Sequence, residues 1–319
     1  MHLKSSMRNM ALDTKALNNL HVLVTGGFGF VGTHLVRKLH ERGVGRITVV
    51  ERNDDGRESF PNVTRVYCDL SDSGSIAILQ TIGDVDFVFN CAGFTDQQMP
   101  HPNPEVLWKA NVLTFLNLTR ALDWGKVIAG VHIGTVAEYG NQEPPFYEHQ
   151  PLQPTNVYGW SKAASTQYAR MMTAQGYAKW RTARLFMAYG PGQKTGFIAD
   201  IIRALARGET FEVNASTVTR DLIFIDDVAE GLIHLAFCAK AMGETVNLCR
   251  GKEITLRKIA QSAHKQIKSG KVIFASRASR QGDFLRSYGS TKKLKQLTGW
   301  RPRIGIEEGL HRTISACIT

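Results

Sequence analysis

The sequence lacks long hydrophobic runs and any stretch typical of an exported protein. Of its 319 residues, 43% are hydrophobic and 21% are charged, which is the composition of an ordinary globular protein. No segment approaches the roughly 20 consecutive apolar residues that a membrane-spanning helix needs. Residues 1–20 also lack the continuous apolar core of a signal peptide. We therefore predict a loose leader over residues 1–20, no membrane association and a cytoplasmic location.

Cysteine is scarce and has no recognisable spacing. The five cysteines are an odd number, and no two of them stand at C-x-x-C spacing. The odd number argues against a disulfide framework, and the missing pairs argue against a zinc site. We predict free thiols in a reducing compartment and no bound metal.

Acidic residues are rare in one part of the chain. The net charge is +11, and the stretch from Arg250 to Arg303 holds fifteen Lys and Arg against two acids. Such a block indicates an anionic partner, which would be a nucleic acid, a membrane surface or a phosphorylated small molecule, or else a solvated basic face. No DNA- or RNA-binding signature accompanies the block, which argues against a nucleic acid.

Strand and helix patterns alternate along the first 190 residues. Short apolar runs predict strands over residues 21–25, 47–50, 63–67, 86–90, 127–133 and 182–187. Helical spacing of apolar residues predicts helices over residues 31–42, 105–124 and 155–172. Strands that alternate with helices predict an α/β fold with a doubly wound parallel sheet.

The pattern changes after Tyr189, where Gly190-Pro191-Gly192 interrupts it and later segments become shorter and more basic. We predict a larger domain over residues 21–190, to which residues 220–240 return. Residues 191–219 and 241–319 would form a smaller, mixed lobe over the carboxyl ends of the sheet.

A glycine-rich loop joins the first predicted strand to the first predicted helix. Gly27, Gly29 and Gly32 match G-x-G-x-x-G, whereas Gly26, Gly29 and Gly32 match G-x-x-G-x-x-G. In either frame the glycines let backbone N–H groups approach a pyrophosphate, and the helix N-terminus adds its positive end. Because the loop lies between a strand and a helix, it predicts a Rossmann domain that binds NAD(H) or NADP(H). The contacts expected there come from Gly26, Gly29, Phe30, Val31 and Gly32.

The end of the second predicted strand bears on the choice of cofactor. Glu51 stands about 20 residues past the glycine loop, where an acid holds the ribose hydroxyls of NAD. Arg52, the next residue, would instead suit the 2′-phosphate of NADP. We expect NAD to be preferred.

Tyr158 and Lys162 stand four residues apart on a predicted helix, which places them on one face. A nearby ammonium group is expected to lower the pKa of the tyrosine, which can then exchange a proton with a sugar oxygen during hydride transfer. Thr135 follows the fifth predicted strand, where its hydroxyl can reach the same oxygen. Asn111 lies in mid-helix, a place that disfavours asparagine. We predict that these four residues, Thr135, Tyr158, Lys162 and Asn111, are catalytic.

These motifs occur in a characteristic order. Further motifs of the same series lie at residues 69–70, 91–93, 184–193, 220–229, 247–252 and 298–302. Over residues 20–312 the sequence resembles the extended short-chain dehydrogenase/reductases of the NAD-dependent epimerase/dehydratase family, in its nucleotide-sugar branch. The resemblance implies a nucleotide-diphosphate sugar as substrate. It also implies a homodimer that pairs through the helices at residues 105–124 and 155–172.

The resemblance also implies residue roles. Asp69 and Leu70 would flank the adenine, Lys162 would hold the nicotinamide ribose, and further cofactor contacts would come from Cys91, Ala92 and Gly93. Arg220 and Arg280 resemble the arginines that grip the substrate diphosphate, a task that suits guanidinium groups. Met187 stands where the family usually has an asparagine that positions the nucleotide sugar.

The residues after Thr135 bear on the reaction. Sugar 4,6-dehydratases of the family carry an acid pair there, whereas this chain has Val136 and Ala137. Glu138 comes one place late, and on an extended chain it would point the opposite way. We therefore expect no dehydratase. Residues 134–140 most resemble GDP-4-keto-6-deoxymannose reductases and related 4-ketoreductases. A nucleotide-sugar 4-epimerase, or a non-catalytic member that binds nucleotides or nucleic acid, is the alternative.

Overall fold

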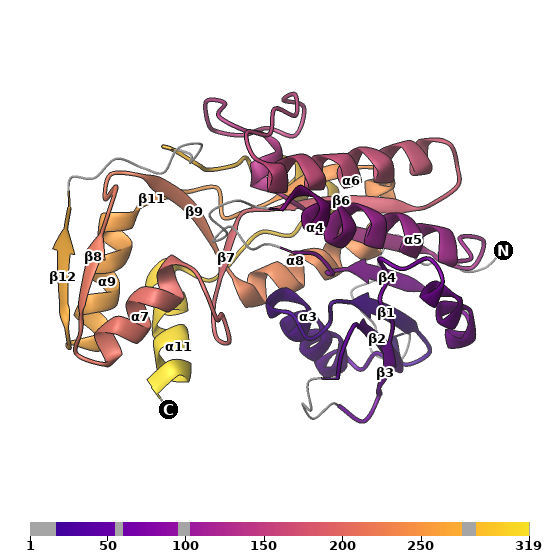
Figure 1. Cartoon of the computed structure of the whole chain (residues 1–319), viewed down its shortest axis with the longest axis horizontal. Coiled ribbons are helices and arrows are strands. Elements are labelled where there is room, and N and C mark those ends of the chain that lie inside the picture. Colours follow the sequence, from indigo (N-terminus) through magenta and orange to yellow (C-terminus); the bar gives the residue numbers. More distant parts are fainter. Residues whose placement is uncertain (1–16, 55–59, 95–102, 276–284, 319) are drawn as a thin grey trace.

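A seven-stranded parallel sheet forms the centre of the protein (Figure 1). The computed structural model describes residues 17–54, 60–94, 103–275 and 285–318. The strands lie in the order β10-β6-β5-β4-β1-β2-β3, and every bonded pair is parallel. Their bounds are β1 (His21–Thr25), β2 (Arg46–Glu51), β3 (Val63–Tyr67), β4 (Phe87–Asn90), β5 (Ala129–Thr135), β6 (Trp180–Leu185) and β10 (Thr245–Leu248). The predicted α/β fold with a doubly wound parallel sheet is confirmed.

Helices cover both faces of this sheet. One face carries α3 (Phe30–Glu41) and α8 (Ile225–Phe237), and the other carries α4 (Pro104–Trp108), α5 (Thr114–Ala121) and α6 (Val157–Ala174) (Figure 1). Successive side chains of a strand point to opposite faces. Accordingly, Val22 and Val24 of β1 belong to one apolar cluster, while Leu23 between them belongs to the other. A strand buried on both faces reads as a continuous apolar run, which is why β1 is recognisable in the sequence.

The helix expected over residues 105–124 is divided in the structure. After α4 the chain makes a π-helical turn, η2 (Lys109–Leu113), before α5 begins, and α5 ends at Ala121. The Thr114 hydroxyl donates to the Lys109 carbonyl at 3.1 Å, five residues earlier, across this wider turn. Such turns often mark functional sites, and this one contains Asn111.

The strand expected over residues 182–187 is also divided. Strand β6 ends at Leu185, and Met187 begins β7 (Met187–Tyr189), which belongs to a separate three-stranded sheet. That sheet has the order β11-β9-β7 and contains β9 (Thr219–Phe224) and β11 (Glu253–Thr255). Between β6 and β7, the Phe186 N–H donates to the Leu248 carbonyl at 3.1 Å, where the chain leaves the main sheet. Met187 therefore lies at the start of the smaller lobe.

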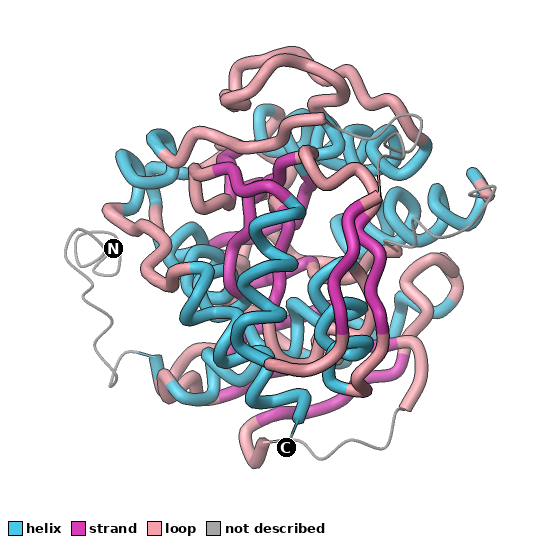
Figure 2. The backbone as a smooth tube through the Cα atoms, turned by 90° about the vertical axis from the view of Figure 1, so that its left-hand side faces the viewer, coloured by secondary structure: helices cyan, strands magenta, loops and turns pink. Residues whose placement is uncertain are grey.

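The smaller lobe groups short strands with amphipathic helices, and Figure 2 looks at it end-on, in front of the main sheet. Strands β8 (Thr210–Val213) and β12 (Lys271–Phe274) pair in parallel. They pack with α7 (Phe197–Ala206) and α9 (Leu256–Ile267) around their own apolar cluster. The remaining helices are α10 (Lys292–Thr298) and α11 (Ile306–Ile318), with short turns η1 (Ser75–Ile82), η3 (Val136–Glu138) and η4 (Ala239–Ala241) elsewhere.

The predicted lobe boundary differs from the structure at one strand. The sequence pattern places all of residues 241–319 in the smaller lobe, yet β10 (Thr245–Leu248) forms the edge of the main sheet beside β6. Its four residues are all buried, because a strand at this edge is still covered by neighbouring helices. Otherwise the division into a Rossmann domain and a substrate lobe stays a prediction.

Two further features of the described residues bear on function. No helix among them is long and apolar enough to cross a membrane. Nor does any group of three His, Cys, Asp or Glu side chains in the described ranges gather as metal ligands would.

Candidate active site

The glycine loop between β1 and α3 is built around two glycines. Gly26 has a φ of +65°, and a Cβ on it would lie 2.7 Å from the backbone nitrogen of Ala92. A Cβ on Gly32 would collide with the carbonyl oxygen of Gly26. Side chains are thus excluded where the loop, the residues after β4 and the start of α3 meet. A Cβ on Gly27 would collide as well, 2.6 Å from Val49 Cγ1, so both glycine frames fit the loop.

The first turn of α3 fits an anionic ligand. The helix begins at Phe30, and the Thr33 N–H makes a bond to the Gly29 carbonyl at 2.9 Å. The N–H groups of Phe30, Val31 and Gly32 lie at the helix N-terminus, before the first hydrogen bond within the helix. The helix dipole adds positive potential there. A glycine-rich loop in front of these groups is a cradle for a pyrophosphate, so the residues present fit a dinucleotide.

Glu51 reaches the glycine loop from the end of β2. Its Oε1 accepts a hydrogen bond from the backbone N–H of Phe28 at 2.6 Å, and the residue is half-buried. Arg52, the competing candidate, is exposed. The acid is therefore the residue that the structure places against the loop.

The other predicted cofactor residues follow β3 and β4. Asp69 is exposed, and hydrogen bonds from the Ser71 hydroxyl and N–H hold its pKa below the ordinary value. Leu70 is buried. After β4, the N–H groups of Cys91 and Ala92 donate to the carbonyl and hydroxyl of Thr25, at 3.0 and 3.3 Å. These residues and the glycine loop therefore share the carboxyl edge of β1 to β4, the usual place for a ligand in such sheets.

Tyr158 lies in the first turn of α6, next to Thr135. Burial raises the pKa of Tyr158 to about 12, and a hydrogen bond with the Thr135 side chain acts in the opposite direction. The expectation that Lys162 lowers this pKa is therefore wrong for the chain alone. Loss of water around the hydroxyl outweighs the charges nearby, so the phenol keeps its proton at neutral pH.

Lys162 lies one turn further along α6 and is 5% exposed. Burial lowers the pKa of its ammonium group to about 8, although the charges of Glu138 and Cys91 raise it. Lys162 therefore titrates close to neutral pH, unlike an exposed lysine.

Asn111 connects the residues after β4 to α6. Its Oδ1 accepts from the Phe94 N–H at 2.8 Å, and its Nδ2 donates to the Ser161 hydroxyl at 2.9 Å. A Cβ on Gly93 would lie 2.9 Å from Asn111 Oδ1 and 3.9 Å from Lys162 Nζ. Asn111 thus lies close to Lys162, with Gly93 beside both of them.

From the sequence alone, Glu138 is a displaced dehydratase acid that an extended chain would point away from the site. The expectation of an extended chain is wrong, because residues 136–138 form the 3-10 turn η3. The Glu138 side chain turns back, and its Oε1 accepts from the Thr135 N–H at 2.8 Å. Thr135-x-x-Glu138 is the S/T-x-x-E capping box, a signal that is readable in the sequence.

Arg184 is the second buried charge that sequence reasoning missed. Its Nε donates to Glu138 Oε2 at 2.8 Å, and the side chains are 2% and 0% exposed. The guanidinium also lies over the ring of Tyr139, 4.5 Å from the centroid. The Tyr139 hydroxyl in turn donates to Asn247 Oδ1 at 2.6 Å. These contacts form a buried polar network beneath Thr135.

Two of the predicted substrate residues, Met187 and Arg220, lie on the smaller sheet. Met187 of β7 pairs in register with Leu222 of β9, two residues after Arg220. Met187 and Arg220 are half-buried. Arg280 lies outside the described residues. The structure thus brings Met187 and Arg220 onto neighbouring strands.

Asp221, which the sequence did not single out, hydrogen-bonds other segments of the smaller lobe. Its carboxylate accepts from the N–H groups of Arg250 at 2.8 Å, Gly251 at 2.9 Å and Gly289 at 3.2 Å. Burial raises its pKa to about 6 despite these bonds.

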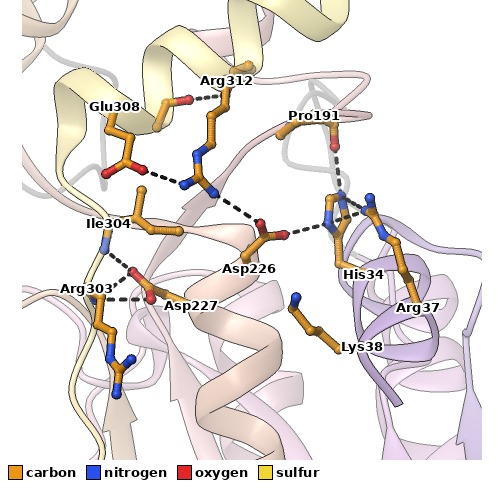
Figure 3. A network of polar contacts seen from close by, with 12 residues as sticks. His34, Arg37, Lys38, Pro191, Asp226, Asp227, Arg303, Ile304, Glu308 and Arg312 are labelled. Carbon is orange, nitrogen blue, oxygen red and sulfur yellow. Dashed lines mark hydrogen bonds and ion pairs between the residues drawn. The ribbon is translucent and has the colours of Figure 1, made fainter. Parts of the chain in front are cut away.

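A second polar network joins α3, α8 and α11 (Figure 3). His34 Nε2 lies 2.9 Å from the Pro191 carbonyl, and its Nδ1 lies 3.3 Å from Asp226, which also faces Arg312 at 3.7 Å. The neighbouring Asp227 accepts from the N–H groups of residues 303 and 304. The helix after the glycine loop is thereby connected to the segment that follows β7.

Comparisons with known proteins cover most of the chain. Residues 22–249 match the NAD dependent epimerase/dehydratase family. Over 307 residues the chain is 27% identical to a Methanocaldococcus jannaschii protein with the provisional name UDP-glucose 4-epimerase, covering 92% of this chain and 97% of that protein. The UDP-glucose 4-epimerase of Thermus thermophilus, solved with NAD, has a TM-score of 0.83 at 27% identity and covers 93% of this chain and 98% of its own. Streptomyces venezuelae dTDP-glucose 4,6-dehydratase, also solved with NAD, has a TM-score of 0.83 at 25% identity, with coverage of 93% and 96%.

Proposed function

This chain belongs to the NAD-dependent epimerase/dehydratase family, and from that premise we propose that it reduces C4 of a nucleotide-linked 4-keto-6-deoxyhexose. It is an enzyme of the short-chain dehydrogenase/reductase type, and its cofactor is NAD(H). Nucleotide sugars are its class of substrate. The position of the reaction on the sugar and its direction are the parts that we propose.

The residues that would hold the cofactor are those at the carboxyl edge of β1 to β4. The glycine loop and the first turn of α3 would bind the pyrophosphate, and Glu51 would bind ribose hydroxyls. Asp69 and Leu70 would lie beside the adenine, and residues 91–93 and Lys162 nearer the nicotinamide. Bound NAD(H) supplies or accepts the hydride at the sugar carbon.

Tyr158 would give its proton to the C4 oxygen. The phenol is protonated at neutral pH, as an ordinary tyrosine is, and a protonated phenol can act as a general acid. The observation that carries reduction is the sequence of residues 134–140, which resembles the 4-ketoreductases of the family, together with Tyr158 buried next to Thr135. The Thr135 hydroxyl would hydrogen-bond the same oxygen, and Lys162 would supply positive charge next to it.

Elimination of water is not part of the proposal. Val136 and Ala137 carry no proton to transfer, and the carboxylate of Glu138 is occupied by Thr135 and Arg184. A dehydratase needs an acid and a base free to act at C5 and C6. Neither is present among the residues that directly follow Thr135.

On the substrate side we propose that Arg220 and Arg280 bind the diphosphate. Met187 cannot donate a hydrogen bond, so the contact that the family asparagine makes with the sugar must be replaced or lost.

Epimerisation at C4 is the second candidate. Two of the relatives carry the name UDP-glucose 4-epimerase, and the same Thr135, Tyr158 and Lys162 would serve that reaction. A non-catalytic member is disfavoured, because a pure binding protein does not need these three side chains together.

The test supplies purified protein with NADH and GDP-, dTDP-, UDP- or CDP-linked 4-keto-6-deoxyhexoses and follows nicotinamide absorbance. Oxidation of NADH that depends on the sugar supports reduction. If none is reduced while UDP-glucose and UDP-galactose interconvert, the epimerase replaces the reductase.

A further inference from the structure

Glu138 lies where the two elements that carry the proposed catalytic side chains meet. Its Oε1 accepts from the Thr135 N–H at 2.8 Å and from the Thr166 hydroxyl at 3.0 Å. Thr166 stands four residues after Lys162 on α6, and Tyr158 stands four residues before it, so the three share one helix face. One carboxylate oxygen therefore joins the end of β5 to the face of α6 that carries Tyr158 and Lys162.

The second oxygen of Glu138 is held by Arg184. The Nε to Oε2 distance is 2.8 Å, and neither side chain is accessible to water beyond 2%. A buried carboxylate is stable only when it is paired and fully hydrogen-bonded, and this one has three donors. Gly134 leaves the space that the carboxylate occupies, because a Cβ there would collide with Oε1.

This arrangement determines what the Thr135 hydroxyl can do. Its oxygen accepts from the N–H of Ala137 at 3.3 Å within η3. A hydroxyl has a single proton, so that proton is directed elsewhere. The hydrogen bond between Thr135 and Tyr158 lowers the pKa of the phenol, which means that it favours the phenolate. The single Thr135 proton is therefore available to Tyr158 in the chain alone, or to the C4 oxygen once a sugar is bound.

We propose that Glu138 is a positioning residue: held by Arg184, it fixes the backbone of Thr135 so that its hydroxyl faces Tyr158, and it places a carboxylate against Thr166, one helical turn from Lys162. The inference rests on the proposed function, since it concerns the same three side chains.

The surroundings of Lys162 are consistent with this role. Glu138 comes first among the charges that raise the Lys162 pKa against burial, followed by Cys91. His132 of β5 is buried and its pKa lies well below the usual value, so it stays neutral and adds no charge. Other titratable groups packed around Glu138 and Arg184 are Tyr158 on α6, Tyr139 after η3 and Glu148 beyond it.

Two double variants separate the contact from the charge. Glu138→Gln/Arg184→Met and Glu138→Met/Arg184→Met both remove the two charges at similar volume. Only glutamine still accepts a hydrogen bond from the Thr135 N–H. Removing both charges avoids leaving Arg184 buried without a counter-ion, which would itself disturb folding.

Turnover tests the contact. Each variant is compared at its own optimal pH, because the optimum itself is expected to move. We expect the glutamine variant to keep kcat within about threefold of its wild-type value, and the methionine variant to lose about 10- to 100-fold with little change in KM. Equal kcat in the two variants, whatever their melting temperatures, would show a purely structural role and overturn the proposal.

Titration of Lys162 by NMR of isotope-labelled lysine, in the chain alone, tests the charge without any turnover. We expect a midpoint of about 8 in the wild type and a midpoint about one pH unit lower in both double variants. Glu148→Gln is the matched control, because it neutralises a carboxylate of the same network that does not act on Lys162. An unchanged Lys162 midpoint in the double variants would overturn the proposal. If the wild type turns over no nucleotide sugar, the proposed function fails, and this titration alone decides the role of Glu138.

Discussion

Trp108 and Trp160 stack on each other with ring centroids 5.1 Å apart, although Trp160 is 50% exposed. Trp108 ends α4 and Trp160 lies in the first turns of α6. Val106 and Met171 of the same helices are exposed as well. Exposed large apolar side chains on neighbouring helices are typical of a protein interface.

We expect a two-fold homodimer that pairs through α4, α5 and α6. The change Trp160→Asp places a charge on this surface and should weaken the dimer at least about tenfold, since desolvating an unpaired carboxylate is costly. Light scattering over a concentration series measures the effect. A wild-type protein that is monomeric at micromolar concentration would contradict the dimer.

The cofactor preference depends on Glu51. Because this carboxylate approaches the glycine loop and repels a 2′-phosphate, NADH should bind at least as tightly as NADPH. Glu51→Ala should reduce the difference in affinity between the two. Fluorescence titration with each cofactor gives the dissociation constants. A wild-type preference for NADPH above about tenfold, or ~1.4 kcal/mol, would transfer the role to Arg52.

Tyr158→Phe removes the proposed proton donor and keeps the ring. Turnover should fall by about 10²–10⁴-fold, while NADH binding stays within about twofold, because the lost hydroxyl acts only on the reacting oxygen. Steady-state kinetics and cofactor titration on the same preparation measure both. Full activity in this variant would refute the mechanism for reduction and for epimerisation alike.

The two proposed diphosphate arginines should act mainly on binding. Arg220→Ala and Arg280→Ala should each raise KM for the nucleotide sugar by about tenfold or more with kcat less affected, because a clamp on the diphosphate serves ground state and transition state equally. Exposed Arg301→Ala is the control, since it removes a charge from the same basic part of the chain. A fall in kcat at unchanged KM would place these arginines elsewhere in the reaction.

Asp221 should make stability depend on pH. Its pKa is about 6 in the folded chain against an ordinary value of 3.8, so between these values the folded state holds a proton that the unfolded state has lost. Protonation of Asp221 therefore favours the folded state. The free energy of unfolding falls by about 1–3 kcal/mol as pH rises from about 4 to about 6. Asp221→Asn does not titrate, so its stability relative to the wild type should improve over that interval. Urea unfolding of both proteins at pH 4 to 7 measures this, and a constant difference would contradict it.

Local patterns in the sequence were enough for the sheet and for much of the candidate site. The apolar run of β1 with the glycines after it predicts a strand, a tight turn and a helix start, because each depends on residues close in the chain. The i, i+4 spacing of Tyr158 and Lys162 likewise determines that both lie on one face of α6, whatever packs against it.

Only the tertiary structure decided the chemistry around those side chains. The Glu138–Arg184 pair joins residues 46 positions apart, and Asp221 collects N–H groups from three distant residues, so no local spacing reports either one. The direction expected for the pKa of Tyr158 is wrong, because sequence spacing shows a charged neighbour but not how much water is excluded. Burial depends on every element that packs around a group, and it is burial that raises the pKa of Tyr158 and lowers the pKa of Lys162.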